Sequence, residues 1–308
     1  MIQKALKRAA GFVVILLILS LCVFALLYAA PGDPAEKRLT AQGVAVTKEV
    51  LDAERERLGL LKPFFVRYGE WLFSVIRGDF GVSFKDDMPV GPKLFQGLKN
   101  TLILTVSSLA LSLVLSFVLS VFSVLRKDKI TDHLVRVLSF ISNALPNFLI
   151  SVLLMYLLCI RWKLFPVIAK GDLQGLFMPV ISLSIPMTGR FIRQMRAEFL
   201  NQMSQDYVTG MRARGVKMRY IMFNVIRNAL GHIFTIVALQ IGTLMGGSVV
   251  IETIFRWPGI GKLVMDSITA RDYPVIMGFV IIMGSIYVII NQISDLLGHA
   301  LDPRGAEE

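Results

Sequence analysis

The sequence predicts an all-α membrane protein with six transmembrane helices, a long extracytoplasmic first loop and a short cytoplasmic helix after the fourth span. Of its 308 residues, 55% are hydrophobic, and the mean hydropathy is +0.64. Six apolar runs lie close to the roughly 20 residues that cross a bilayer, and none contains Lys, Arg, Asp or Glu. The bilayer core offers the backbone no hydrogen-bond partner, so these runs should be helices. They cover residues 9–32, 100–125, 137–160, 173–189, 233–251 and 273–294.

The first run follows three basic residues, Lys4, Lys7 and Arg8, as the apolar core of a signal peptide would. That core usually has about 7–15 residues, whereas this run is longer. We therefore expect residues 1–32 to be an uncleaved N-terminal anchor and first transmembrane helix, with the N-terminus in the cytoplasm.

Basic residues alternate between the loops as the positive-inside rule requires. The loops after the second and fourth spans carry four and eight Lys or Arg, and those after the third and fifth carry three each. Both termini of this multi-pass membrane protein are therefore expected in the cytoplasm. Because the cations lie in loops beside the spans, the net charge of +11 indicates a lipid bilayer and not nucleic acid as partner.

The first loop, residues 33–99, is nearly balanced in charge and has local signals of its own. Thr47 is a candidate cap for a helix that extends to Leu61, with apolar residues at helical spacing. The aromatic segment 63–73 suits an interfacial helix at the outer surface, with its rings at headgroup level. Residues 78–81 are predicted to form a turn.

Prolines lie inside two of the spans, Pro146 in the third and Pro186 in the fourth. Each can break a helical hydrogen bond and kink its helix. Such kinks either line a path through the bundle or only adjust packing, and the sequence does not separate these two interpretations.

The segment between the fourth and fifth spans predicts a short amphipathic helix. Met203, Tyr207, Val208 and Met211 fall on one side of it, and Gly215 is suited to end it. No core of the chain's own is expected nearby to cover this apolar stripe. The helix would then lie on the headgroups, with its basic residues at anionic lipid, or dock on a soluble partner.

Several kinds of chemistry are absent from the sequence. It has no phosphate-binding loop, since residues 259–263 have the wrong spacing, and it has no zinc-protease helix, serine elbow or metal-ligand spacing. Ion-coupled carriers bury ionisable groups near mid-membrane, and the spans hold none. We therefore expect no catalytic and no metal-binding residue. What remains is a pore or scaffold that needs an external energy source, with a passive channel and a membrane-embedded enzyme as the alternatives.

The chain resembles the transmembrane permeases of ABC importers, specifically those of the dipeptide/oligopeptide/nickel family. The likeness covers nearly the whole chain and rests on short strings of residues in the same order. These strings are 30–35, 58–60, 78–83, 206–215, 226–230, 250–261, 270–275 and 301–304. The resemblance implies a type I ABC-importer permease fold, with an extracytoplasmic segment at 33–99 and a permease core at 100–308 that contains a coupling loop at 190–230.

The resemblance also implies a location in the bacterial plasma (inner) membrane and a set of partners. A second, homologous permease would complete a heterodimer, two cytoplasmic ATPase subunits would bind ATP and Mg²⁺, and an extracytoplasmic solute-binding protein would deliver the cargo; this chain itself would hold no cofactor. The residues that would couple to the ATPase are Met203, Asp206, Tyr207, Val208, Met211, Arg212, Ala213, Arg214 and Gly215. Those that would face the binding protein are Trp257, Pro258, Gly259, Gly261, Asp272 and Tyr273.

The likeness leaves the cargo open between short peptides, nickel and metal chelates, with a slight similarity to the metal-importing branch. Two departures from the family pattern lie in the coupling loop or directly after it. Residues 209–211 read Thr-Gly-Met where the family often has Arg-Thr-Ala, and His232 stands where a proline often does. Gly210 should loosen the helix by about 1 kcal/mol relative to alanine.

Overall fold

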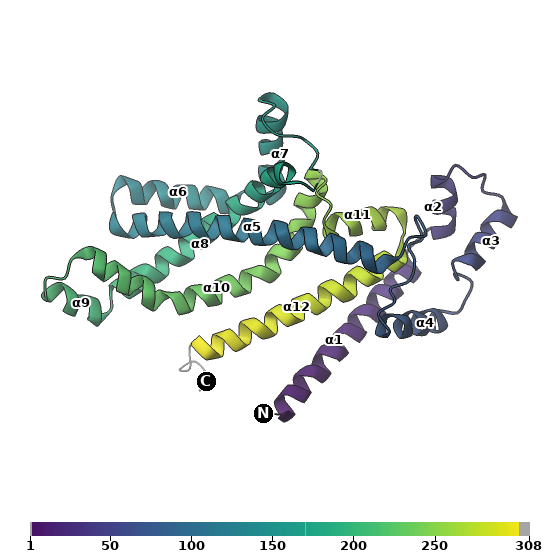
Figure 1. Cartoon of the computed structure of the whole chain (residues 1–308), viewed down its shortest axis with the longest axis horizontal. Coiled ribbons are helices and arrows are strands. Elements are labelled where there is room, and N and C mark those ends of the chain that lie inside the picture. The colour runs from purple at the N-terminus through teal and green to yellow at the C-terminus, as the bar shows by residue number, and fades with distance from the viewer. Residues whose placement is uncertain (1, 170, 302–308) are drawn as a thin grey trace. The chain divides into compact units, whose positions relative to one another are not determined.

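The computed structural model describes residues 2–169 and 171–301, and every regular element in those ranges is a helix (Figure 1). The last of the family-like strings, 301–304, extends beyond the described residues. The helices in chain order are α1 (Ile2–Ala29), α2 (Pro34–Ala41), α3 (Lys48–Arg57), α4 (Phe64–Ile76), α5 (Val90–Leu125), α6 (Ile130–Ala144), α7 (Asn147–Leu154), the π-helix η1 (Met155–Arg161), α8 (Leu173–Met203), α9 (Asp206–Ala213), α10 (Met218–Phe255), α11 (Ile260–Ala270) and α12 (Tyr273–Leu301).

Five of the described helices are long and apolar enough to cross a membrane, and a bent pair would make six. The pair consists of α6 and the α7–η1 segment, which meet at 100°. Pro146 caps α7 there, after Leu145 has taken up an extended backbone. The kink predicted in the third span is therefore a break, because proline disfavours the helical conformation in the residue before it. In contrast, α8 continues through Pro179 and Pro186.

The chain divides into two compact units that are discontinuous in sequence. The first contains residues 1–100 and 258–289, and the second contains residues 101–257 and the chain from 290 on. The division in sequence order proposed above did not anticipate that 258–289 belongs with the first hundred residues.

The first unit contains the outer helices expected in 33–99. Thr47 caps α3 as predicted, because its side chain accepts from the Val50 amide, although α3 ends at Arg57 and not at Leu61. Helix α4 covers the aromatic segment. Its Phe64 ring packs 5.1 Å from that of Phe24 in α1, while Phe65 on the other side is 80% exposed.

An ion pair ties two outer segments of the first unit together. Arg38 of α2 donates to the carbonyl of Phe84 and to both carboxylate oxygens of Asp87. The hydrogen bond from Arg38 holds the pKa of Asp87 below its usual value. The turn at 78–81 is also present, with Gly78 and Gly81 at positive φ and the Gly81 amide bonded to Asp79.

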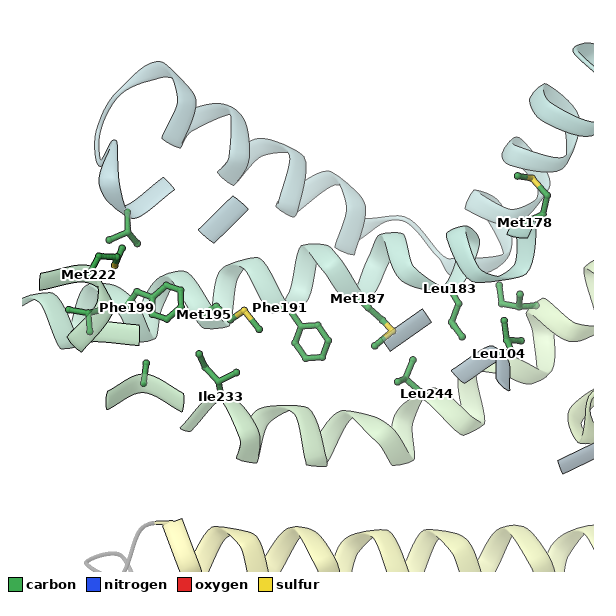
Figure 2. Close-up of a cluster of buried hydrophobic side chains, with 14 of the residues drawn as sticks. Leu104, Met178, Leu183, Met187, Phe191, Met195, Phe199, Met222, Ile233 and Leu244 are labelled. Carbon is green, nitrogen blue, oxygen red and sulfur yellow. The ribbon is translucent and has the colours of Figure 1, made fainter. Parts of the chain in front are cut away.

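The second unit is organised around α8. A side chain faces α10 at every fourth residue of α8, which is close to the helical repeat and keeps them on one side (Figure 2). These residues are Leu183, Met187, Phe191, Met195 and Phe199. Figure 2 shows them pointing toward Ile233 and Leu244 of α10. This core extends along α8 well past residue 189, where the apolar run ends.

Small residues bring α5 and α6 close to α8 within the same unit. Ser112 and Ser120 of α5 donate to the carbonyls of Ser184 and Ile192 in α8. On α8, Gly189 lies so near α6 that an added Cβ would fall 2.0 Å from the Ser142 hydroxyl. Small side chains at contacts of this kind allow helix backbones to approach in a membrane.

Candidate functional site

Helix α9 forms the tip of the second unit, between the ends of α8 and α10 (Figure 1). It ends as predicted at Gly215, which adopts φ +69°. The Gly215 amide donates to the carbonyl of Arg212 at 2.9 Å, and the Val216 amide donates to that of Met211 at 3.0 Å. These two bonds form a Schellman motif, which fixes the direction in which the chain leaves the helix.

The apolar side of α9 is covered by the chain's own core. Val208 is 1% exposed and belongs to the same buried cluster as Phe199 of α8 and Ile221 of α10; Tyr207 and Met211 pack against that cluster. The expectation that no core lies nearby was therefore wrong. Helices α8 and α10 extend beyond their apolar runs and carry their packed interface down to α9. Val208 is thus closed to a docking partner and to the headgroups, while Met203, Tyr207 and Met211 remain partly exposed beside it.

The opposite side of α9 is the surface that remains free. It is small and polar, and its exposed residues are Asp206, Thr209, Gly210, Arg212, Ala213 and Arg214. Among the described residues, neither Arg212 nor Arg214 has a side-chain hydrogen bond or an ion pair. Two unpaired guanidinium groups beside small side chains make a cationic, accessible face that an acidic partner surface can approach.

Polar contacts connect α9 to both neighbouring helices. The Tyr207 hydroxyl lies 3.3 Å from Gln202 Oε1, and Gln202 Nε2 donates to Glu198 Oε1 at 3.0 Å. The other oxygen of Glu198 lies 4.0 Å from His232 Nε2 on α10. Sequence reasoning missed Gln202 and Glu198, although their spacing of four places them on one side of α8. His232 thus meets an acid at the position where the family often has proline.

The outer residues predicted to face a binding protein fall into two groups. Trp257 is 2% exposed and lies in the core of the second unit, while Asp272 of the first unit is 1% exposed. Gly259 and Gly261 are also buried, whereas Pro258 is exposed and Tyr273 is half-buried. Direct contact of Trp257 or Asp272 with a partner is therefore excluded in this structure, since a side chain must reach the surface to be touched.

Asp272 instead holds together two of the family-like strings inside the first unit. Its carboxylate accepts from the Ser83 hydroxyl and, at 2.9 Å, from the Phe84 amide. The neighbouring Arg271 donates to the carbonyls of Pro31 and Gly32. Segments near 31, 83 and 272 thus form one small polar junction, which positions the outer loop without presenting these side chains outward.

Replacing Asp272 by Ala is expected to destabilise the protein by about 1–3 kcal/mol, because the two donors lose their acceptor in a buried site. Proteolysis within residues 78–89 should become faster, and the thermal midpoint in detergent should fall. Asp266→Ala is the matched control, since Asp266 is an exposed carboxylate that pairs with Lys262 on the surface. Equal behaviour of the two variants would contradict the role given to Asp272.

No metal centre is found among the described residues, where no three His, Cys, Asp or Glu side chains converge. The candidate site consists of α9 and the ends of α8 and α10.

Comparison with known proteins identifies the family. Residues 112–306 match the binding-protein-dependent transport system inner membrane component, and residues 1–107 match the N-terminal part of a binding-protein-dependent transport system membrane component. The chain belongs to this family. The permease is therefore a transmembrane subunit of an ATP-driven ABC importer, as its resemblance to the dipeptide/oligopeptide/nickel permeases implied.

Relatives of the permease match it along nearly its whole length. The metal-staphylopine import system permease protein CntB of Staphylococcus aureus strain NCTC 8325 is 33% identical over 305 residues, which cover 99% of this chain and 98% of the relative. The nickel import system permease protein NikB of Staphylococcus aureus strain bovine RF122 is 36% identical over 304 residues, covering 98% and 92%.

A solved structure agrees with the fold. The permease resembles a chain from inward-facing conformations of the MetNI methionine ABC transporter, with a TM-score of 0.55 and 16% identity, over 68% of this chain and 96% of that one. At this identity the likeness concerns the fold alone. It supports the all-α fold over the part of the chain that is matched.

Proposed function

We propose that this permease forms half of the passage through which an importer moves nickel or another metal ion held in a small chelate. The observation that carries the proposal is the full-length similarity, at 33% and 36% identity, to permeases named for metal-staphylopine and nickel import. Short peptides are the second candidate cargo, because the dipeptide and oligopeptide permeases share the family's sequence strings.

The permease works with four other subunits in this proposal. A second, related permease completes the passage, two ATPases bind ATP and Mg²⁺ on the cytoplasmic side, and a solute-binding protein delivers the cargo outside. The alternation of basic loops supports this orientation, with both termini and α9 in the cytoplasm. In this proposal ATP hydrolysis belongs to the two ATPase partners.

Helix α9 is the element through which the ATPases move the permease. Its exposed face, with Arg212 and Arg214 unpaired, offers the contact surface, while Val208 and Tyr207 anchor the helix to α8 and α10. A helix fixed in this way transmits a push as a rigid body, because its apolar side cannot shift without opening the core. The roles of the residues predicted for coupling thus divide into an anchoring side and a docking side.

Uptake measurements distinguish the candidate cargoes. Cells that carry the complete importer, with this permease intact or deleted, receive radioactive Ni²⁺ alone, Ni²⁺ with excess L-histidine, or radioactive dialanine. Deletion is expected to lower nickel uptake under at least one of the two nickel conditions and to leave dialanine uptake unchanged. Loss of dialanine uptake alone would assign the importer to peptides. Activity of the isolated chain, as ion currents or as hydrolysis without partners, would favour the channel or enzyme interpretation.

A further inference from the structure

A basic cavity of about 520 Å³ lies between α6 and α8 in the second unit. Four of its lining side chains are basic, and none is acidic. They are His133 and Arg136 from α6 and Arg193 and Arg196 from α8. The remaining walls are mostly apolar and include Phe140 of α6, which is 66% exposed. A cavity with this lining favours a ligand that carries negative charge beside apolar groups.

The buried acid behind the cavity leaves much of this positive charge free. Asp132 is fully buried and accepts from Arg196 at 2.9 and 2.8 Å, so it compensates the charge of Arg196. Arg136 is farther away, with its Nε atom 3.8 Å from Asp132 Oδ2. Arg193 is exposed and, among the described residues, has neither a side-chain hydrogen bond nor an ion pair. One carboxylate therefore faces three guanidinium groups.

The position of the cavity indicates that its ligand is a lipid. Helix α6 begins at Ile130, directly after the basic turn with Arg126, Lys127 and Lys129, so Arg136 lies within two turns of the predicted cytoplasmic surface. Beside the cavity, Leu134 and Leu138 are 57% and 62% exposed on α6. Basic pockets between membrane helices on the cytoplasmic side suit anionic headgroups, and the apolar side chains suit acyl chains.

We propose that the cavity between α6 and α8 binds the phosphate headgroup of an anionic glycerophospholipid of the inner leaflet. Arg136 and Arg193 hold the phosphate, and Phe140 contacts the upper part of the acyl chains. Arg196 stays with Asp132, so the lipid adds a second link between α6 and the part of α8 that carries α9.

The test uses the assembled importer in nanodiscs, with phosphatidylglycerol as the probe in a phosphatidylcholine background. In the double variant Arg136→Gln/Arg193→Gln, phosphatidylglycerol affinity, read by native mass spectrometry of bound lipid, is expected to fall roughly tenfold or more. Both side chains are exposed, so the variant should fold. Arg161→Gln/Lys163→Gln is the matched control, because it removes two exposed charges after η1 and should leave the affinity unchanged.

Three results would overturn the proposal. The first is equal loss of phosphatidylglycerol in both double variants. The second is unchanged affinity in the cavity variant. The third is displacement of the lipid by inorganic phosphate at equal concentration, which would show an anion site without lipid preference. A photo-crosslinker at Phe140 should label lipid, and labelling of the second permease instead would assign this surface to the heterodimer.

Discussion

Gly189→Ala is expected to lower the free energy of unfolding by about 1–3 kcal/mol, the usual cost of overpacking a close contact. The new methyl group would lie 2.0 Å from Ser142 Oγ and 2.6 Å from the carbonyl oxygen of Ser139. The serine hydroxyl can rotate away, but the carbonyl belongs to the backbone of α6. Helix α6 must therefore move away from α8, and the Asp132–Arg196 pair between them would weaken with it.

Gly246→Ala provides the matched control for this prediction. The same substitution is made inside a long helix, where an added Cβ meets nothing within 4 Å. It should raise stability by up to about 1 kcal/mol, since alanine favours the helix over glycine. The two variants should thus shift the thermal midpoint in detergent in opposite directions. A rise in both would show that α6 and α8 do not approach as closely as described.

The double variant Arg212→Glu/Arg214→Glu is expected to abolish uptake and cargo-stimulated ATP hydrolysis by the complex. Both side chains are exposed and unpaired among the described residues, so the variant should insert and fold normally. Like charges brought together at an interface cost several kcal/mol, and co-purification of the ATPase should drop roughly tenfold or more.

Arg126→Glu/Lys127→Glu is the control for docking. It reverses two exposed charges in the turn between α5 and α6, which the basic-loop pattern places on the same side of the membrane. Any general effect of lost basic residues on insertion is then shared by both variants. Near-normal ATP hydrolysis and uptake in Arg212→Glu/Arg214→Glu would remove α9 from the coupling path.

The helix cap at Thr47 and the helix end at Gly215 could be predicted from the sequence, because each is made by hydrogen bonds between residues close together in the chain. Thr47 caps α3 through an amide three residues away, and α9 ends at Gly215 through the Gly215 amide bonded three residues back and the Val216 amide bonded five residues back. The residue types at these positions determine the backbone directly. The apolar runs likewise predicted most of the helices that could cross a membrane. Two of them differ: the third is broken at Pro146, and the apolar window of α10 covers Met218–Gly242, whereas the sequence predicted a fifth span at 233–251.

Burial of the candidate site could not be predicted in the same way. Val208 is covered because α8 and α10 continue past their apolar runs and pack around it. Charged residues between Phe199 and Ile221 lower the mean hydropathy there, so the hydropathy pattern does not reveal the packed side of these segments. Asp272 is covered by Ser83, which lies 189 residues away in the chain. No periodicity reports such a pairing, because it depends on tertiary contacts. Asp272 is therefore a buried support, although its place in a family-like string predicts a surface contact.

The interior between α8 and α10 is unusually rich in thioethers. Met187, Met195 and Met222 are all buried there, and two serine hydroxyls of α5 point at the sulfur atoms of Met187 and Met195. Methionine is unbranched and polarisable, so it refills irregular spaces when neighbours shift. Methionine side chains between α8 and α10 can therefore take up small shifts of these two helices by changing rotamer. We expect this adaptability to matter during the nucleotide-driven cycle of the importer, when the packing inside the subunit must follow the movement passed on by α9.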